Sequence, residues 1–324
     1  MSRATAGPGH AVVMRVTSRY PRWLPVAFAF CLALAAAAAL PARVSAYSWC
    51  SYVNGVVTLN LAAEHVIRLL VVDGRIEFAD LTHYQFKGRC GSATVHNTDR
   101  IRITEDDPGS SRLQFDQQIG RFGPGRTPEA TGRSEIEVNL GTLRDIWIMG
   151  RSTSQVITIG ERGVNINGDG DVDLIGSRLA EIYVFTHGGD DVVRATGGHG
   201  TGDRWLPPTW GYLAASTGDG DDLLIGTSRN DHFHGDGGFD ELSGRGGHDF
   251  LDGGNISDVI RGGEGRDEII GGSWADVIAA GPGNDFIDAY DLTADELDGG
   301  TGFDTAHVDL DDSLTSIEAT PPPN

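Results

Sequence analysis

Two signatures of catalysis are missing from the sequence. Neither the zinc-binding pattern H-E-x-x-H nor the nucleophile-elbow pattern G-x-S-x-G occurs in the 324 residues. Their absence excludes the motif-based assignments to zinc metalloproteases and to serine hydrolases. Asp73, Glu77, Asp80 and His83 are close in sequence, but strand alternation would scatter them over two faces. We therefore expect no catalytic residues and no enzyme.

Long hydrophobic runs are also scarce, since one apolar run, residues 24–40, stands out. It covers about 17 residues, which is short for a membrane-spanning helix. Four arginines precede it, and the small residues 44–46 follow it as a candidate cleavage point. We expect residues 1–46 to be a cleaved Sec-type export signal, so that the protein is secreted and keeps no stable membrane insertion. An uncleaved anchor is the alternative.

Cysteine is rare, with three residues in the chain. Cys31 lies inside the predicted signal, so Cys50 and Cys90 remain in the exported part. An even number of cysteines in an oxidising compartment favours a disulfide between them, which contributes on the order of 4 kcal/mol in the chain-entropy model. Two buried thiols are the alternative.

Positive charge is nearly absent from the second half of the chain. Residues 47–168 contain 14 acidic and 13 basic residues, net −1, whereas residues 169–324 contain 32 acidic and 7 basic residues, net −25. Such a segment repels nucleic acid and anionic membranes, and it also repels itself. A cationic component should therefore belong to its folded state.

The acidic half is built from a nine-residue repeat. Counted from residue 217, eight consecutive units end at residue 288, the first being TGDGDDLLI and the sixth GGEGRDEII. A large apolar residue fills position eight of every unit, from Leu224 to Ile287. Aspartate fills position six of all eight units: Asp222, Asp231, Asp240, Asp249, Asp258, Asp267, Asp276 and Asp285.

These units resemble the repeats-in-toxin (RTX) or hemolysin-type calcium-binding nonapeptide, G-G-x-G-x-D-x-U-x, a repeat of secreted bacterial proteins. Looser units with Asp173, Asp191 and Asp304 at position six extend the pattern on both sides. The resemblance implies that the position-six aspartates and main-chain carbonyls of the glycine turns bind several Ca²⁺ ions. The position-four glycines expected in these turns are Gly220, Gly238, Gly247, Gly265 and Gly283.

A unit of this length is half a coil of a flattened solenoid, so two units complete an 18-residue coil. The expected fold is all-β, a right-handed parallel β-roll, in which equivalent aspartates stack about 4.8 Å apart. Bare carboxylates at that spacing repel by roughly 3 to 4 kcal/mol at an effective dielectric near 20. Oxygen ligands without cysteine select a hard ion, and irregular cages suit calcium better than magnesium.

The repeats sort into two edges of the roll, because neighbours in space are 18 residues apart. One edge has Arg229 and then glycines at position four. The other has two glycines followed by Ile256 and Trp274. Since glycine tolerates positive φ and a β-branched residue does not, we expect weak or empty ion sites near Ile256 and Trp274.

The remaining segments follow from the same pattern. Residues 47–167 show short alternating strands, and the steps from Ile148 through Ile157, Ile166 and Ile175 are again nine residues. We expect a solenoid or cap region with one disulfide here, the calcium-binding roll at 168–307, and a C-terminal cap with a disordered tail at 308–324. The insertion at 199–216 is predicted either to cover a flank of the roll or to form an aromatic platform for a sugar.

Members of the resembled family include secreted proteases, lipases and alginate epimerases, in which the repeats accompany a catalytic domain. Toxin relatives leave the cell through a C-terminal signal, so toxicity is not carried over to this chain. We expect a secreted, calcium-binding structural, adhesive or surface-associated protein. The alternative is calcium-dependent binding or modification of a polysaccharide, by analogy with lyases and epimerases on β-solenoids. His232 and His234 flank the inward Phe233 beside Asp252, as solvated residues or as a transition-metal site.

Overall fold

The computed structural model describes residues 48–82, 85–107, 110–117, 136–167, 172–176, 179–197 and 212–320. These residues belong to one compact unit, Ala46–Asn324. The predicted signal at 1–46, most of the insertion at 199–216 and the end of the predicted tail, 321–324, lie outside the described residues.

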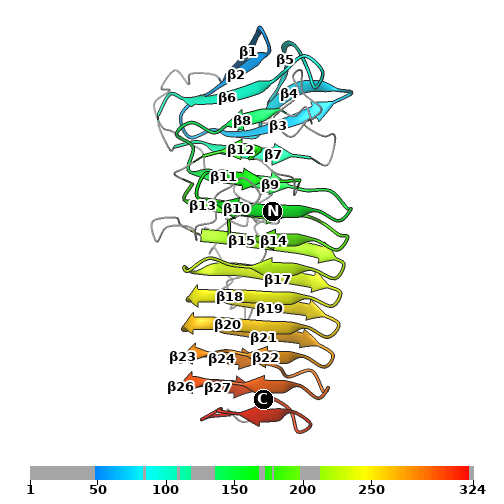
Figure 1. The fold of residues 1–324 in the computed structure, drawn as a ribbon, viewed down its shortest axis with the longest axis vertical. Coiled ribbons are helices and arrows are strands. Elements are labelled where there is room, and N and C mark those ends of the chain that lie inside the picture. Colours follow the sequence, from blue (N-terminus) through cyan, green and yellow to red (C-terminus); the bar gives the residue numbers. More distant parts are fainter. Residues whose placement is uncertain are drawn as a thin grey trace, which may run out of the picture. The chain divides into compact units, whose positions relative to one another are not determined.

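The described strands form two sheets, of 16 and 12 strands (Figure 1). The described residues contain no helix, and hence none long and apolar enough to cross a membrane. The larger sheet consists of β1 (Trp49–Val53), β2 (Val56–Leu61), β6 (Arg100–Glu105), β8 (Glu137–Asn139), β12 (Leu174–Ile175), β11 (Gly163–Asn165), β10 (Val156–Gly160), β14 (Val192–Arg194), β16 (Leu223–Ile225), β18 (Glu241–Gly247), β20 (Val259–Gly265), β22 (Val277–Ala279), β25 (Glu296–Asp298) and β28 (Ser313–Thr315), with β23 (Pro282–Gly283) and β26 (Thr301–Gly302) beside β20. The smaller sheet consists of β27 (Thr305–His307), β24 (Phe286–Asp288), β21 (Glu268–Ser273), β19 (Phe250–Asn255), β17 (Asp231–Gly237), β15 (Tyr212–Asp219), β13 (Glu181–Phe185), β9 (Asp145–Met149), β7 (Arg112–Asp116), β3 (Val66–Val72), β4 (Arg75–Asp80) and β5 (Gln85–Thr94).

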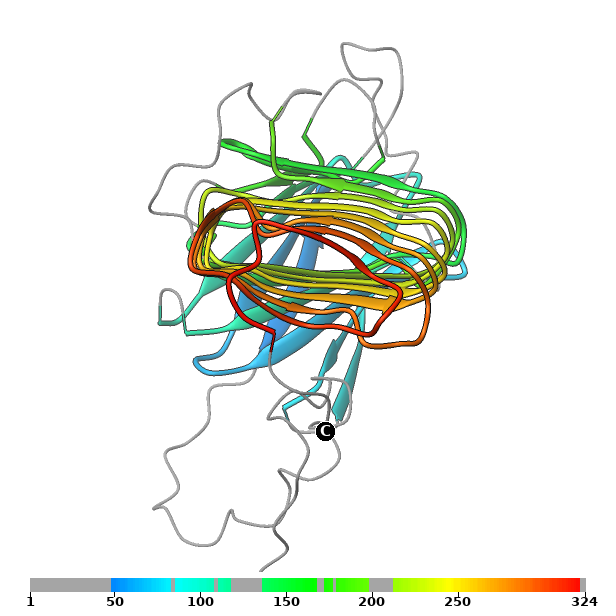
Figure 2. The ribbon, with the colours of Figure 1, turned by 90° about the horizontal axis from the view of Figure 1, so that it is seen from below.

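The nonapeptides alternate between the two sheets, and every strand of the repeat region pairs in parallel with the strand one coil away. Leu224 lies beside Leu242, and Phe233 lies beside Leu251, each 18 residues apart. Seen end on, the coils superpose as flattened loops with two long sides (Figure 2). The predicted all-β parallel roll with 18-residue coils is confirmed in this region.

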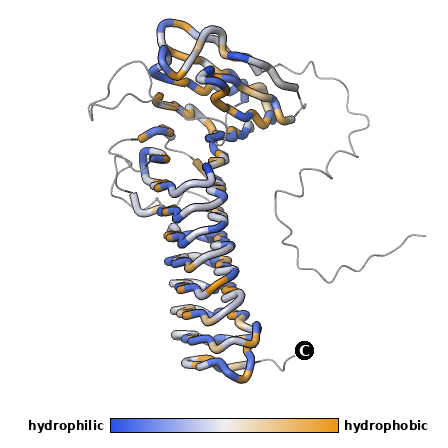
Figure 3. The backbone as a smooth tube through the Cα atoms, turned by 90° about the vertical axis from the view of Figure 1, so that its right-hand side faces the viewer, coloured by the Kyte–Doolittle hydropathy of each residue, from blue (hydrophilic) through white to orange (hydrophobic). Residues whose placement is uncertain are grey.

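The core of the roll is one column of apolar side chains from each sheet. The position-eight side chains between the sheets are buried, for example Phe233 and Ile260, both with no exposed surface. Their strand neighbours point outward, so hydrophobic and hydrophilic positions alternate along the coils (Figure 3). Since only one side chain per unit fills the interior, the turns must supply the rest of the stability.

The coil length changes outside the eight units. Ile278 pairs with Leu297 and Ile287 with Ala306, so one extra residue enters each half-coil after residue 288. Upstream, Val193 pairs with Leu224, which is 31 residues away across the predicted insertion.

The nine-residue steps between Ile148 and Ile175 do not form 18-residue coils, contrary to the sequence prediction. Here Ile148 pairs in parallel with Val184, 36 residues away. The segment between them folds back, because β10, β11 and β12 pair antiparallel. Parallel pairing nevertheless continues through the N-terminal half, in β2 with β6 and in β3 with β7 and β9.

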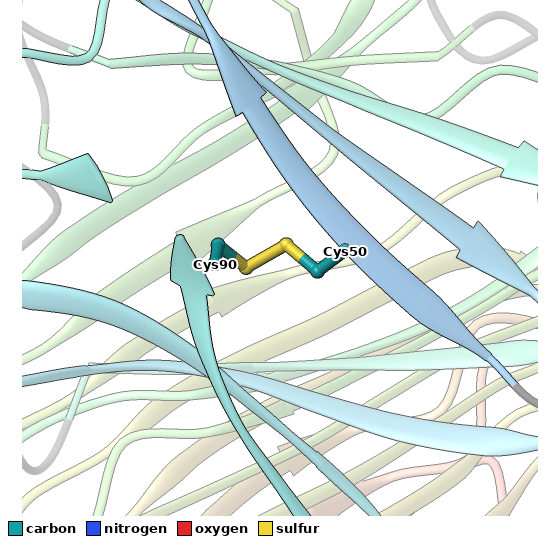
Figure 4. The surroundings of a disulfide bond; sticks show 2 residues. All are labelled: Cys50 and Cys90. Carbon is teal, nitrogen blue, oxygen red and sulfur yellow. A yellow bond between two sulfur atoms is a disulfide. The ribbon is translucent and has the colours of Figure 1, made fainter. Parts of the chain in front are cut away.

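The predicted disulfide is present. Cys50 of β1 and Cys90 of β5 are bonded, with their Cα atoms 5.1 Å apart (Figure 4). The bond joins the first strand of the larger sheet to the last strand of the smaller sheet. It therefore closes the N-terminal end of the sheet pair covalently.

Candidate metal centre

The position-six aspartates form two rows, one along each edge of the roll. In each row, the backbone N–H of one aspartate donates a hydrogen bond to Oδ1 of the aspartate one coil on. Asp222 donates to Asp240, and Asp240 to Asp258, both at 2.8 Å. The first row consists of Asp191, Asp222, Asp240, Asp258, Asp276, Asp295 and Asp312.

The second row repeats this arrangement on the other edge. Asp231 donates to Asp249 at 2.7 Å, and the row closes where Asp304 donates to Oε2 of Glu318 at 2.7 Å. The first row begins in the same manner, since the N–H of Gln155 donates to Asp191. The second row consists of Asp231, Asp249, Asp267, Asp285 and Asp304.

The other carboxylate oxygen of these aspartates is buried and accepts no hydrogen bond. A buried, unsatisfied charged oxygen costs several kcal/mol, so a native fold needs a partner for it. A cation is the partner that carboxylates take most strongly in a dry site. The Oδ2 atoms concerned belong to Asp191, Asp222, Asp240, Asp249, Asp258, Asp267, Asp276, Asp285, Asp295 and Asp304.

Backbone carbonyls converge on the same places as these oxygens. Beside Gly235, the point where a Cβ would lie is taken by Oδ2 of Asp240 and the carbonyl oxygen of Gly253 from the next coil. Gly244 has the equivalent pair, Asp249 and Gly262. Position one therefore needs glycine, and the donor set of carboxylate plus carbonyl oxygen fits calcium. Among the described residues, no three His, Cys, Asp or Glu side chains form a ready-made metal cluster, so side chains alone do not make the site.

Burial is the largest cause of the raised pKa values in the rows. The pKa is raised to about 6 for Asp222, to about 7 for Asp240 and to about 8 for Asp258. The backbone N–H donors lower these pKa values, and the neighbouring carboxylates raise them again. The ion-free rows thus hold protons at a pH where free aspartate does not.

Position four separates the turns into two kinds. Gly220, Gly238, Gly247 and Gly265 have φ between 130° and 143°, whereas Gly283 has no positive φ, contrary to its prediction as a left-handed glycine. At Gly265 the carbonyl of Gly247 lies where a Cβ would be, so no other residue fits this turn.

Ile256 and Trp274 take a different turn, with φ of 80° and 81°. Their side chains are 51% and 63% exposed, and the N–H of Trp274 donates to Oδ2 of Asp291 at 2.6 Å. Leu292 repeats this turn at φ 76°, with its N–H bonded to Asp309. A carboxylate hydrogen bond therefore holds two of these turns together.

Two predicted features of the rows differ from the structure. Asp173 lies outside both rows, because it follows the antiparallel β11 and its Oδ2 accepts the N–H of Ile166 at 2.7 Å. Asp295 belongs to the first row but was not predicted, since the extra residue before it hides the glycine pattern. The signal for Asp295 was the D-E-L-D sequence, which keeps aspartate two residues before an inward leucine.

A buried Ser–His–Asp group in the N-terminal half does not form a catalytic triad. Nδ1 of His65 lies 3.3 Å from Oγ of Ser48 and 3.0 Å from Oδ2 of Asp80. A triad needs the serine and the carboxylate on different ring nitrogens. Glu77, another residue of the acidic stretch near 80, pairs with Arg89, and His83 lies outside the described residues.

The raised pKa values predict an unusual pH dependence of the ion-free fold. Between about pH 4 and pH 8 the folded state binds more protons than the unfolded state, so its stability falls as pH rises. In the presence of a chelator, we expect the melting temperature to be higher at pH 5 than at pH 8, by roughly 4 to 8 °C for every 2 kcal/mol of difference. Thermal melts followed by circular dichroism measure this.

The matching control is the same pair of melts in excess calcium. Metal ligands must be deprotonated, so the order should reverse and pH 8 should give the higher melting temperature. A melting temperature that rises from pH 5 to pH 8 in chelator would contradict the assignment of these pKa values to the rows.

Comparison with known proteins assigns the repeat. Residues 216–251 and 252–287 each match the family described as the RTX calcium-binding nonapeptide repeat (4 copies). No curated protein and no solved structure matches the chain. The matched segment contains five turns with position-four glycine and both aspartate rows. The chain therefore carries RTX-type calcium-binding repeats at residues 216–287, folded as a parallel β-roll.

Proposed function

We propose that this protein is secreted, that its acidic half folds on binding several Ca²⁺ ions outside the cell, and that it acts there as a non-catalytic structural or adhesive protein of the cell surface. One observation carries the proposal: ten buried carboxylate oxygens in two rows accept no hydrogen bond. Without cations these rows are a cost to folding, and with cations they become its driving force.

The energetics favour coupled binding and folding. Adjacent carboxylates about one strand spacing apart repel by roughly 3 to 4 kcal/mol at an effective dielectric near 20, and each row contains several such pairs. An ion that binds only the folded state stabilises it by mass action. A chain of net −25 in residues 169–324 should therefore be loose at low calcium and folded at the millimolar calcium of the exterior.

The residues that would hold the ions are the row aspartates and the carbonyls beside them. Oδ2 of Asp240 with the carbonyl of Gly253, and Oδ2 of Asp249 with the carbonyl of Gly262, are two such sets. Calcium supplies positive charge and accepts six to eight oxygen ligands in flexible geometry. The position-one glycines leave the space that these oxygens need.

Export is supported by two features of the chain. The disulfide between Cys50 and Cys90 is a bond that persists in oxidising compartments. The apolar run at 24–40 with its leading arginines is typical of a secretory signal.

Calcium should control the secondary structure of the full chain. We expect far-ultraviolet circular dichroism in chelator to lack much of the β signal, and the signal to appear as calcium rises to millimolar concentration. Asp258→Asn keeps the shape of a row residue but removes its charge, so its transition should move to higher calcium. Glu268→Gln is the matched control, because Glu268 lies on the exposed outer face of β21.

An unchanged β spectrum across the titration would overturn the proposal. So would an equal response to magnesium, because simple screening of charge does not distinguish the two ions.

Trp274 marks a weak end of one calcium row. Trp274→Gly should allow the turn that Gly220 and Gly238 adopt, and we expect calcium binding in this row to tighten and the melting temperature in calcium to rise. Isothermal titration and thermal melts measure the two effects. Phe239→Gly, which changes an exposed residue next to a glycine turn, should bring no gain. No change for Trp274→Gly in either measurement would contradict the assignment.

Binding or modification of a polysaccharide is the second candidate, and one observation favours it. Trp147, Tyr183 and Tyr212 form a ladder on the outer face of the smaller sheet, with ring centroids 5.3 and 5.8 Å apart. All three rings are partly exposed. Aromatic rings at successive coils are a surface on which the apolar faces of sugar rings can pack.

Affinity electrophoresis against neutral and acidic polysaccharides tests this candidate. If it holds, one polysaccharide should retard the calcium-loaded protein, and Tyr183→Ala should abolish the retardation. Tyr290→Ala, at an exposed tyrosine outside the ladder, is the control. Equal migration of the wild-type protein in all gels would exclude the second candidate.

A further inference from the structure

Two histidines lie side by side on the outer face of strand β17. His232 and His234 are two residues apart, so both project from the same side of the strand, while Phe233 between them is buried in the core. The face they share points away from the interior of the roll. They are thus separate from the aspartate rows, which run along the turns.

Their ring nitrogens converge. Nε2 of His232 lies 2.9 Å from Nε2 of His234. At most one proton fits between two imidazole nitrogens at this distance, so at least one of them presents a lone pair to the other.

A carboxylate one coil away orients the second ring. Asp252 of β19 stands directly beside His234 in the parallel register, and its Oδ2 lies 3.2 Å from Nδ1 of His234. This contact places the proton of a neutral His234 on Nδ1 and leaves Nε2 as the acceptor. Phe250, in register with His232, stacks on that ring at 4.4 Å and 12° and fixes its plane.

We propose that His232 and His234 form a binding site for a borderline first-row divalent ion, Zn²⁺ or Cu²⁺, held by their two Nε2 atoms with Asp252 as the orienting carboxylate. Imidazole nitrogen suits these metals, whereas calcium takes oxygen ligands, so the site is chemically distinct from the rows. A carboxylate on the far nitrogen of a ligating histidine is the usual support of such a site.

The site is open to solvent. The side chains of His234 and Asp252 are 35% and 29% exposed. Two protein nitrogens leave further coordination positions for water or for an external ligand. The ion would then stand on the outside of the roll, accessible to whatever the roll contacts.

A second His–Asp pair on the same sheet provides an internal comparison. Nδ1 of His307 lies 3.1 Å from Oδ1 of Asp288, and the ring stacks on Tyr290 at 4.8 Å. Residue 305, two positions before His307, is a threonine rather than a second histidine. This pair therefore has the orienting carboxylate but only one ligating nitrogen.

Titration of the full chain with Zn²⁺ in millimolar calcium tests the proposal, because excess calcium occupies the carboxylate rows. Isothermal titration should show one zinc site in the wild-type protein. His234→Gln should abolish it, and Asp252→Asn should weaken it by about 10- to 100-fold, the usual cost of losing an orienting partner. With one equivalent of Cu²⁺, electron paramagnetic resonance should show coupling to two nitrogens.

His307→Gln is the matched control and should leave zinc binding unchanged. Circular dichroism in calcium establishes that each variant keeps the fold, and His232→Gln provides a second test of the same site. The proposal is overturned if the wild-type protein binds zinc no better than His234→Gln does, or if His307→Gln weakens binding as much as His234→Gln.

Discussion

Stacking of buried carboxylates at the spacing of one coil is the constraint on which the rest of the roll depends. Each row aspartate gives its N–H to the carboxylate one coil on, so the row is a backbone feature as well as a line of charge. The same coils contribute one inward apolar side chain per unit, which is a thin core. The turns, and what they bind, must therefore decide whether the roll is folded.

The repeat region could be predicted from the sequence because its contacts are set by a constant separation. Once Leu224 and Leu242 are assigned to adjacent coils, the positions of Asp222 and Asp240 follow, and so do the two edges. The departures at Ile256 and Trp274 were also visible, since they replace glycine at a turn with positive φ. Local sequence and long-range pairing carry the same information here.

The remaining features depend on pairings that the local pattern does not determine. A nine-residue step of apolar residues, as from Ile148 to Ile175, fits a coil of the solenoid and also the hairpins of β10 to β12. Only the choice of partner strand distinguishes them, and it excludes Asp173 from the rows. The convergence of His232, His234 and Asp252 was foreseeable from register alone, but the contact between the two Nε2 atoms depends on ring orientations set by packing.

The disulfide and the unequal charge of the two halves together give the assembly a direction. The half closed by Cys50 and Cys90 is nearly neutral, so it can fold without ions, and its strands β13 and β14 pair with β15 and β16 of the roll. Each new coil then needs only the surface of the coil before it. The folded N-terminal half is thus a template at one end of the acidic chain, and growth should proceed away from the disulfide.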